Sequence, residues 1–137
     1  CEGGTIDWAA HDNRTMSMVE NVIDFDNAVK VAYQFYLEHP DETLIVVTAD
    51  HETGGLTLGC GSSTINWEKM ENQWIESGKK NVLDHKANAE CNRSCSIGWT
   101  TGSHTGGAVP VFAVGVGAEE FAGRIDNTDI KGKILGK

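Results

Sequence analysis

The sequence contains no apolar run approaching the roughly 18 unbroken residues that a membrane-spanning helix needs. No basic stretch precedes an apolar stretch at its start, so no signal peptide is expected, an absence that says little if the chain is a fragment. Internal repeats and low-complexity tracts are also lacking. The 137 residues, 39% of them hydrophobic, are sufficient for one compact domain with a core.

Basic side chains are scarce: the sequence has 11 Lys and Arg and 20 Asp and Glu, which gives a formal net charge of -9. Nucleic acid and anionic membranes gain nothing by releasing counterions from an acidic surface, so neither is expected as a partner. The charge also disfavours attraction of an anionic substrate, unless bound metal ions reverse the local field.

The sequence has only four cysteines, and no two of them show the Cys-x-x-Cys spacing of zinc ribbons or thioredoxin-like proteins. Cys91 and Cys95 are close enough to form a disulfide across a loop, and two free thiols are an equally good interpretation. Because such disulfides are favoured outside the cytoplasm, the cysteine pair weakly favours an extracytoplasmic location of the protein, either periplasmic or secreted.

A long helix and two short strands organise the chain. Apolar residues recur at steps of three and four over about 18–37, which predicts a helix that ends before Pro40. The β-branched run 43–49 predicts a strand buried on both faces, as in a parallel sheet, and 109–115 predicts another strand. This order is typical of an α/β fold. Two strands cannot close such a sheet, so we expect the chain to be part of a larger one.

Residues 59–103 form the least regular stretch and are interpreted as a surface insertion rich in loops. Within them, the spacing of Trp67, Met70 and Trp74 predicts a short amphipathic helix that ends near Gly78.

Three histidine-bearing segments carry candidate metal ligands. Asp7 and His11 are four residues apart, and on a helix this spacing puts both side chains on one face within reach of one ion. The alternative interpretation is a carboxylate at the start of a helix beside a solvated histidine. Asp50 and His51 follow the first predicted strand, where open α/β sheets often carry their sites, or they are a polar strand end. His104 lies among glycines that let the backbone approach a ligand, or it is a flexible loop histidine.

The three segments resemble known motifs of one family. The stretches 2–11 (EGGTIDWAAH), 48–55 (TADHETGG) and 104–106 (HTG) strongly resemble segments of the alkaline phosphatase family, in the same order. The resemblance covers nearly the whole chain, and it identifies residues 1–137 as the C-terminal portion of an alkaline phosphatase domain. It implies a three-layer α/β fold with a central, mostly parallel sheet that is incomplete in this chain.

The resemblance also implies a role for each candidate ligand. The implied protein ligands are Asp7, His11 and His104 for a first zinc ion, Asp50 and His51 for a second zinc ion, and Glu2 for a nearby magnesium ion. The remaining ligands of the second zinc and of the magnesium would come from an upstream segment. The other histidines, His39 and His85, lie in polar contexts and are expected at the surface.

The implied reaction is hydrolysis of small phosphate monoesters, in which two divalent ions assist attack by a serine. The family's serine lies in an Asp-Ser-Ala sequence, and no Asp-Ser pair occurs here. The nucleophile is therefore expected in an upstream half of the same protein, and the isolated chain is expected to be inactive. The family is commonly dimeric, which makes a homodimer a candidate assembly.

Two alternatives to this function stay open. The chain could bind metal without turnover, or it could belong to a relative that acts on phosphodiesters or sulfate esters. The motifs at residues 2–7 and 50–53 favour the phosphate monoester.

Overall fold

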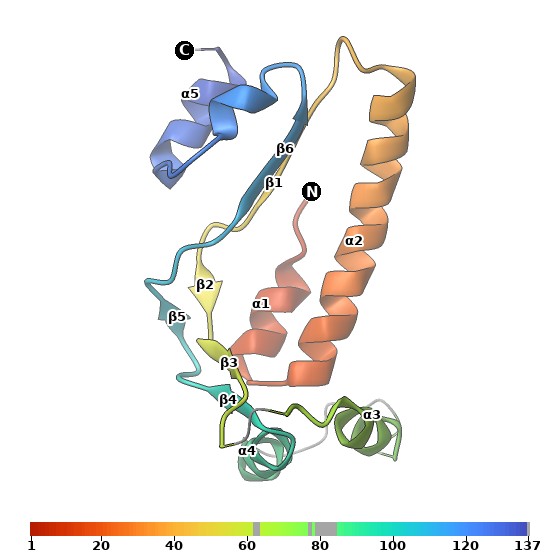
Figure 1. The fold of residues 1–137 in the computed structure, drawn as a ribbon, viewed down its shortest axis with the longest axis vertical. Helices are drawn as coiled ribbons and strands as arrows, with labels where there is room; N and C mark the ends of the chain where they lie inside the picture. Colours follow the sequence, from red (N-terminus) through yellow and green to blue (C-terminus); the bar gives the residue numbers. More distant parts are fainter. Residues whose placement is uncertain (62–63, 77, 79–84, 137) are drawn as a thin grey trace. The chain divides into compact units, whose positions relative to one another are not determined.

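The computed structural model describes residues 1–61, 64–76, 78 and 85–136, which form two compact units (Figure 1). The first unit contains Cys1–Phe25 and Glu52–Gly107, and the second contains Asp26–His51 and Ala108–Lys137. Each unit thus combines two separate stretches of the chain.

Two helices open the chain. α1 (Gly4–His11) is followed by α2 (Thr15–Glu38), and Asn13 makes the turn between them in the left-handed region, with φ of 53°. α2 confirms the predicted long helix and begins three residues earlier than expected. It ends before Pro40, as the sequence predicts. Among the described residues, no helix is both long and apolar enough to cross a membrane.

The first unit also contains two antiparallel strand pairs. β2 (Glu52–Thr53) pairs with β5 (His104–Thr105), and β3 (Leu56–Leu58) pairs with β4 (Ile97–Trp99). The pairing of β2 with β5 was not expected, because two-residue strands leave no periodicity in a sequence.

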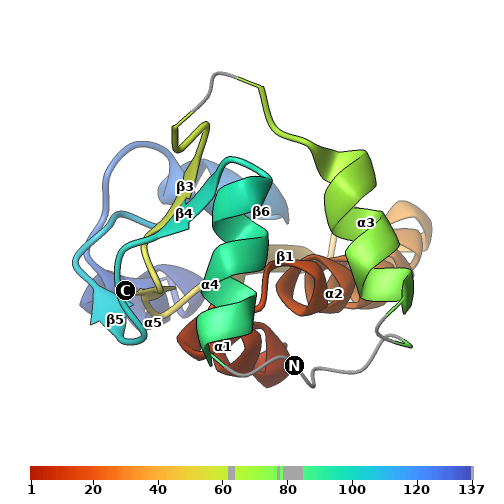
Figure 2. The ribbon, with the colours of Figure 1, turned by 90° about the horizontal axis from the view of Figure 1, so that it is seen from below.

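Residues 59–103 are more regular than the sequence indicates. They contain α3 (Trp67–Glu76), which confirms the predicted amphipathic helix, and α4 (His85–Ser94), which was not predicted because its sequence is almost entirely polar. α4 lies beside β4 (Figure 2). The prediction for the side chain of His85 lies outside the described residues.

A small core joins these elements. Its centre consists of the buried side chains of Met70 in α3, Cys95 directly after α4, and Ile97 in β4. The partly buried residues packed against it are Met16, Leu56, Ile65, Cys91 and Trp99. Burial of these apolar side chains is the main contribution that holds α3 and α4 against β3 and β4.

The second unit is built on β1 (Leu44–Thr48) and β6 (Val111–Gly115), which confirm the two predicted strands. All five residues of each strand pair in antiparallel register, from Leu44 opposite Gly115 to Thr48 opposite Val111. Two 3₁₀ helices and α5 (Ile130–Ile134) follow β6 (Figure 1). The expectation that β1 is buried on both faces is wrong for this chain, since its residues are half-buried or exposed. An unbroken apolar run indicates that a strand is suited to burial on both faces of a complete sheet. It does not specify whether the neighbouring strand is parallel or antiparallel.

Candidate metal centre

α1 places Asp7 and His11 one turn apart, as the sequence predicts. His11 Nε2 lies 3.4 Å from Asp7 Oδ2. The other ring nitrogen, Nδ1, is 2.8 Å from the carbonyl oxygen of Gly102. A carbonyl can only accept a hydrogen bond, so Nδ1 carries the proton and Nε2 of the neutral ring presents a lone pair.

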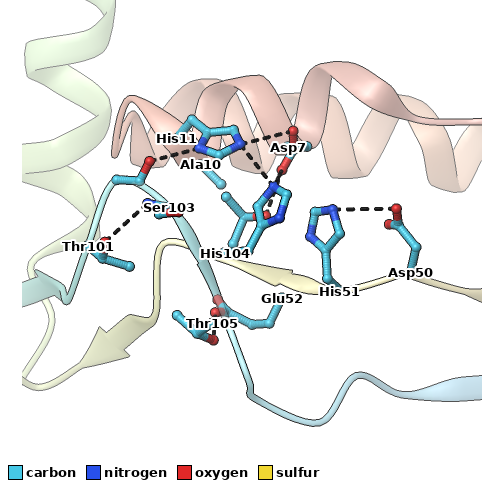
Figure 3. Close-up of polar contacts among 12 residues, drawn as sticks. Asp7, Ala10, His11, Asp50, His51, Glu52, Thr101, Ser103, His104 and Thr105 are labelled. Atoms are coloured by element: carbon cyan, nitrogen blue, oxygen red, sulfur yellow. Dashed lines mark hydrogen bonds and ion pairs between the residues drawn. The ribbon is translucent and has the colours of Figure 1, made fainter. Parts of the chain in front are cut away.

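His104 reaches the same place through the pairing of β5 with β2, in which it lies opposite Thr53. Its Nε2 is 3.2 Å from His11 Nε2 and 3.7 Å from Asp7 Oδ1 (Figure 3). His11 and His104 are 93 residues apart in sequence, and their ring centroids are 4.9 Å apart. The antiparallel pair therefore brings a third candidate ligand to the two on α1.

The three side chains fit a divalent metal ion. Four ligand atoms placed tetrahedrally at about 2.0–2.1 Å from zinc are about 3.3 Å from one another. The observed separations between the facing atoms are 3.2, 3.4 and 3.7 Å. The Asp7 carboxylate and the His11 lone pair are both electron-pair donors, and they face the same place as the ring of His104. A cation bound among the three side chains would interact favourably with both. All three side chains are partly exposed, which leaves room for a fourth ligand.

Glu52 and Thr53 support this centre from β2. The Thr53 hydroxyl donates a 2.6 Å hydrogen bond to Asp7 Oδ1, on the carboxylate whose other oxygen faces His11. The Glu52 carboxylate accepts from the backbone N–H of Gly55 at 3.0 and 3.1 Å, and from the Thr105 hydroxyl beside His104. Such outer contacts orient metal ligands.

The turn after Thr53 requires glycine. Gly54 has φ of 89°, and a Cβ there would lie 2.5 Å from the Trp99 ring. Close packing of this turn against β4 therefore depends on the missing side chain, and it keeps β2 in place beside α1.

Thr53→Val should weaken zinc binding by about 10- to 100-fold, because valine keeps the shape of the side chain but cannot orient the Asp7 carboxylate. Titration with a zinc chelator competitor measures the change. Thr57→Val, on the exposed side of β3, is the matched control and should leave the affinity unchanged. Equal affinities for the two variants would contradict a role for the Thr53 hydroxyl.

Asn13 connects the end of α1 to the segment before β5. Its side-chain amide donates to the carbonyl oxygen of Ala10 at 2.9 Å and to that of Thr101 at 2.8 Å. These bonds lie next to His11 and close to His104 in sequence. These hydrogen bonds connect the turn that ends α1 to the segment that carries the third candidate ligand.

α4 holds the same turn from its other side. Asn88 and Asn92 each donate a side-chain hydrogen bond to the Asn13 carbonyl oxygen, at 2.9 and 2.8 Å. Asn92 also accepts from the Thr15 hydroxyl at 2.7 Å, and that hydroxyl accepts from the Trp99 indole at 3.0 Å. Asn92 and Thr15 are buried, so each bond satisfies a group that water cannot reach.

Asn92→Ala should destabilise the protein by about 1–3 kcal/mol, because it removes the acceptor of the buried Thr15 hydroxyl and one of the two side-chain donors to the Asn13 carbonyl. Urea unfolding measures the loss. Asn27→Ala, at an exposed position of α2, is the control and should change the unfolding free energy by less than about 0.5 kcal/mol. A similar small change for Asn92→Ala would show that the network adds nothing to stability.

The other candidate ligands lie outside α1. Asp50 and His51 follow β1 in the second unit, where the sequence places them, and His51 Nε2 is 3.4 Å from Asp50 Oδ2 (Figure 3). Asp50 is exposed and His51 is half-buried. Glu2 precedes α1, and its side chain is exposed. The first unit by itself therefore brings together Asp7, His11 and His104.

The residues that support the candidate ligands were not predicted from the sequence. Glu52 and Thr53 lie within the TADHETGG motif, so the motif is a signal that could have revealed them. Asn13 and Asn92 left no such signal, because they are 79 residues apart and belong to no common pattern.

Comparison with known proteins decides the family. The sequence profile described as alkaline phosphatase matches residues 1–83 and 65–135. This chain belongs to the alkaline phosphatase family. Alkaline phosphatase 4 of Bacillus subtilis (strain 168) is 35% identical over 169 aligned residues, which include 93% of this chain and 36% of the relative. The chain thus spans roughly a third of the length of that relative.

Solved structures support the same family. The cold-active alkaline phosphatase of a psychrophilic Shewanella sp. matches with a TM-score of 0.82 and 30% identity, over 98% of this chain and 44% of that one. A variant of the alkaline phosphatase of TAB5, solved with Mg bound in its M3 site, matches with a TM-score of 0.71 and 33% identity, over 98% and 34%. The fold is therefore the three-layer α/β fold of alkaline phosphatases, and the chain is an incomplete part of it.

Proposed function

We propose that this chain provides metal ligands to a phosphatase that hydrolyses small phosphate monoesters. The observation that carries the proposal is the convergence of Asp7, His11 and His104, whose facing atoms have the separations of a tetrahedral ligand set. Membership of the alkaline phosphatase family supports the same reaction.

Each proposed metal ion has its own set of candidate ligands in this chain. The proposed ligands are Asp7, His11 and His104 for one zinc ion, Asp50 and His51 for a second, and Glu2 for magnesium. The Mg bound by the TAB5 variant supports a magnesium site in this family. When bound, the ions would supply Lewis-acid stabilisation of charge on the phosphoryl and leaving-group oxygens.

A backbone carbonyl and a side-chain hydroxyl orient the proposed ligands of the first zinc ion. The Gly102 carbonyl oxygen keeps the proton of His11 on Nδ1, so that Nε2 is free to bind. The Thr53 hydroxyl holds one oxygen of Asp7, so that the carboxylate does not rotate away. Because the chain is acidic overall, bound cations would also be needed to attract an anionic substrate.

The proposal includes an upstream half of the same protein, which supplies the serine and the remaining ligands. Residues 1–137 would then be the C-terminal portion of the domain, with an insertion at about 59–103. Large exposed apolar side chains support this, since they are suited to packing against further chain: Val31, Phe35, Leu37 and Phe112. The family resemblance also supports a homodimer and an extracytoplasmic location, and both belong to the proposal.

Zinc binding by the chain itself tests the metal assignment. After reconstitution, elemental analysis should find one tightly held zinc per chain, and the NMR signals of the His11 and His104 rings should shift. The variant His11→Ala should lose this zinc, and Asn27→Ala should keep it. A reconstituted chain that holds no zinc, with both rings unperturbed, would count against the site.

A second candidate, metal binding without turnover, is favoured for the isolated chain by the lack of an Asp-Ser pair. A third candidate, a relative acting on phosphodiesters or sulfate esters, is tested by assaying the longer protein against aryl phosphates, bis-aryl phosphates and aryl sulfates. Preference for the phosphate monoester would support our proposal, and preference for either of the others would replace it.

A further inference from the structure

Three sulfur-bearing side chains, Met70, Cys91 and Cys95, pack together in the first unit, on elements that the proposed phosphatase site does not use. Cys91 Sγ is 3.7 Å from Met70 Sδ, and its thiol donates to Gln73 Oε1 at 2.7 Å. Cys95 Sγ lies 3.9 Å from the same Gln73 oxygen. Cys91 lies in the last turn of α4, Cys95 follows the helix directly and its N–H donates to the Cys91 carbonyl oxygen, and both cysteines are free thiols.

The cluster is buried on one side and accessible on the other. Cys95 is 0% exposed and Met70 is 3% exposed, whereas Cys91 is partly exposed. Cys91 and Gln73 line a pocket of about 530 Å³ between α3 and α4. Glu76 and Glu90 also line this pocket together with Lys69, so two carboxylates outweigh one ammonium and the balance favours the approach of a cation. The cation would meet Cys91, which lines the pocket, before the buried sulfurs of Cys95 and Met70.

We propose that Cys91, Cys95 and Met70 bind one soft, thiophilic cation, Cu(I). A metal–sulfur distance of about 2.3 Å places the sulfur ligands of one ion about 3.8–4.0 Å apart. The observed separation between Cys91 Sγ and Met70 Sδ is 3.7 Å. Two thiolates and a thioether select Cu(I), whereas zinc prefers thiolate, imidazole and carboxylate ligands.

Binding requires only the loss of thiol protons. Burial and the neighbouring Cys95 raise the pKa of the Cys91 thiol, so the thiol form predominates at neutral pH when no metal is bound. Cu(I) would replace the protons of the two thiols, which leave to solvent, and no atom changes its oxidation state. The site is separate from the ligands on α1 and β5, and its occupancy does not depend on phosphatase activity.

Anaerobic titration of the reduced full chain with Cu(I), in competition with a bathocuproine chelator, tests the site. One equivalent should bind with an affinity that survives the competitor. Cys91→Ser and Cys95→Ser should each lower the affinity at least about 10-fold, and Met70→Leu, which conserves core volume, should lower it measurably with an unchanged circular dichroism spectrum. The matched control, Cys60→Ser, should bind as the unaltered chain does.

A second measurement on the unaltered chain avoids any effect of substitution on folding. Bound Cu(I) should protect Cys91 from alkylation, read by mass spectrometry, while the exposed Cys1 and Cys60 continue to react. The proposal is overturned if the chain retains no Cu(I) against the competitor, or if bound Cu(I) does not protect Cys91. It is also overturned if zinc binds the cluster as tightly as Cu(I) and Met70→Leu changes the affinity for neither ion.

Discussion

His104→Ala, introduced into the protein that includes the upstream half, should lower kcat/KM for an aryl phosphate by at least about 100-fold. Loss of a partner that only orients a metal ligand costs about 10- to 100-fold, so loss of a ligand itself should reach or exceed the upper end. The alanine removes the nitrogen that lies 3.2 Å from His11 Nε2 and 3.7 Å from Asp7 Oδ1, which leaves two of the three proposed protein ligands for the ion. Steady-state kinetics and zinc content, measured on the same sample, should fall together.

His39→Ala is the matched control for this substitution. The His39 ring contacts Glu42 at 3.0 Å and stacks on Phe35 at the end of α2, in the second unit. Its removal should change kcat/KM by no more than about twofold, which corresponds to the small effects typical of surface positions. Near-normal turnover of His104→Ala would remove His104 from the site, even if the zinc content of the protein were unchanged.

The isolated chain should show no measurable phosphatase turnover, and activity should appear only when the upstream half is supplied. Removing the serine nucleophile from a hydrolase lowers kcat on the order of 10⁶-fold, and this chain contains no Asp-Ser pair that could provide one. Hydrolysis of an aryl phosphate by the chain alone, by the upstream half alone and by the two together measures the effect.

The two-part assay has its own control. A chain that carries His104→Ala should associate with the upstream half but should restore at least about 100-fold less turnover than the unaltered chain, which separates assembly from metal binding. Robust hydrolysis by the unaltered chain alone would contradict the argument from the missing serine, and it would require a different nucleophile among the residues present.

The long elements could be predicted because their patterns are local. α2 repeats its apolar positions over more than five turns, and β1 and β6 are unbroken apolar runs, so each specifies its own conformation. β1 is nevertheless only half-buried here, whereas its sequence is suited to burial on both faces. Since the chain covers roughly a third of its curated relative, that difference is expected for a strand of an incomplete sheet.

The stretch 59–103 shows where local patterns fail. Its one amphipathic helix, α3, was predicted from three apolar positions, but α4 has almost none and was not. α4 is held instead by its asparagines, which bond to the Asn13 carbonyl, and by Cys95 in the core. The end of this helix places Cys91 in its last turn and Cys95 directly after it, both as free thiols, so the alternative of a disulfide across a loop does not describe this structure.

The sequence by itself determined the family and the choice of candidate ligands, because the motifs around Asp7, Asp50 and His104 are contiguous strings whose order is visible without a fold. The resemblance implied that Asp7, His11 and His104 share one ion. Only the tertiary structure decided how His104 reaches Asp7 and His11, through the pairing of β2 with β5, and that Thr53 and Asn13 form hydrogen bonds beside them. Side chains within four residues of each other are brought together by the helix itself. Contacts across 93 residues depend on strand pairing and buried hydrogen bonds, which a linear pattern does not record.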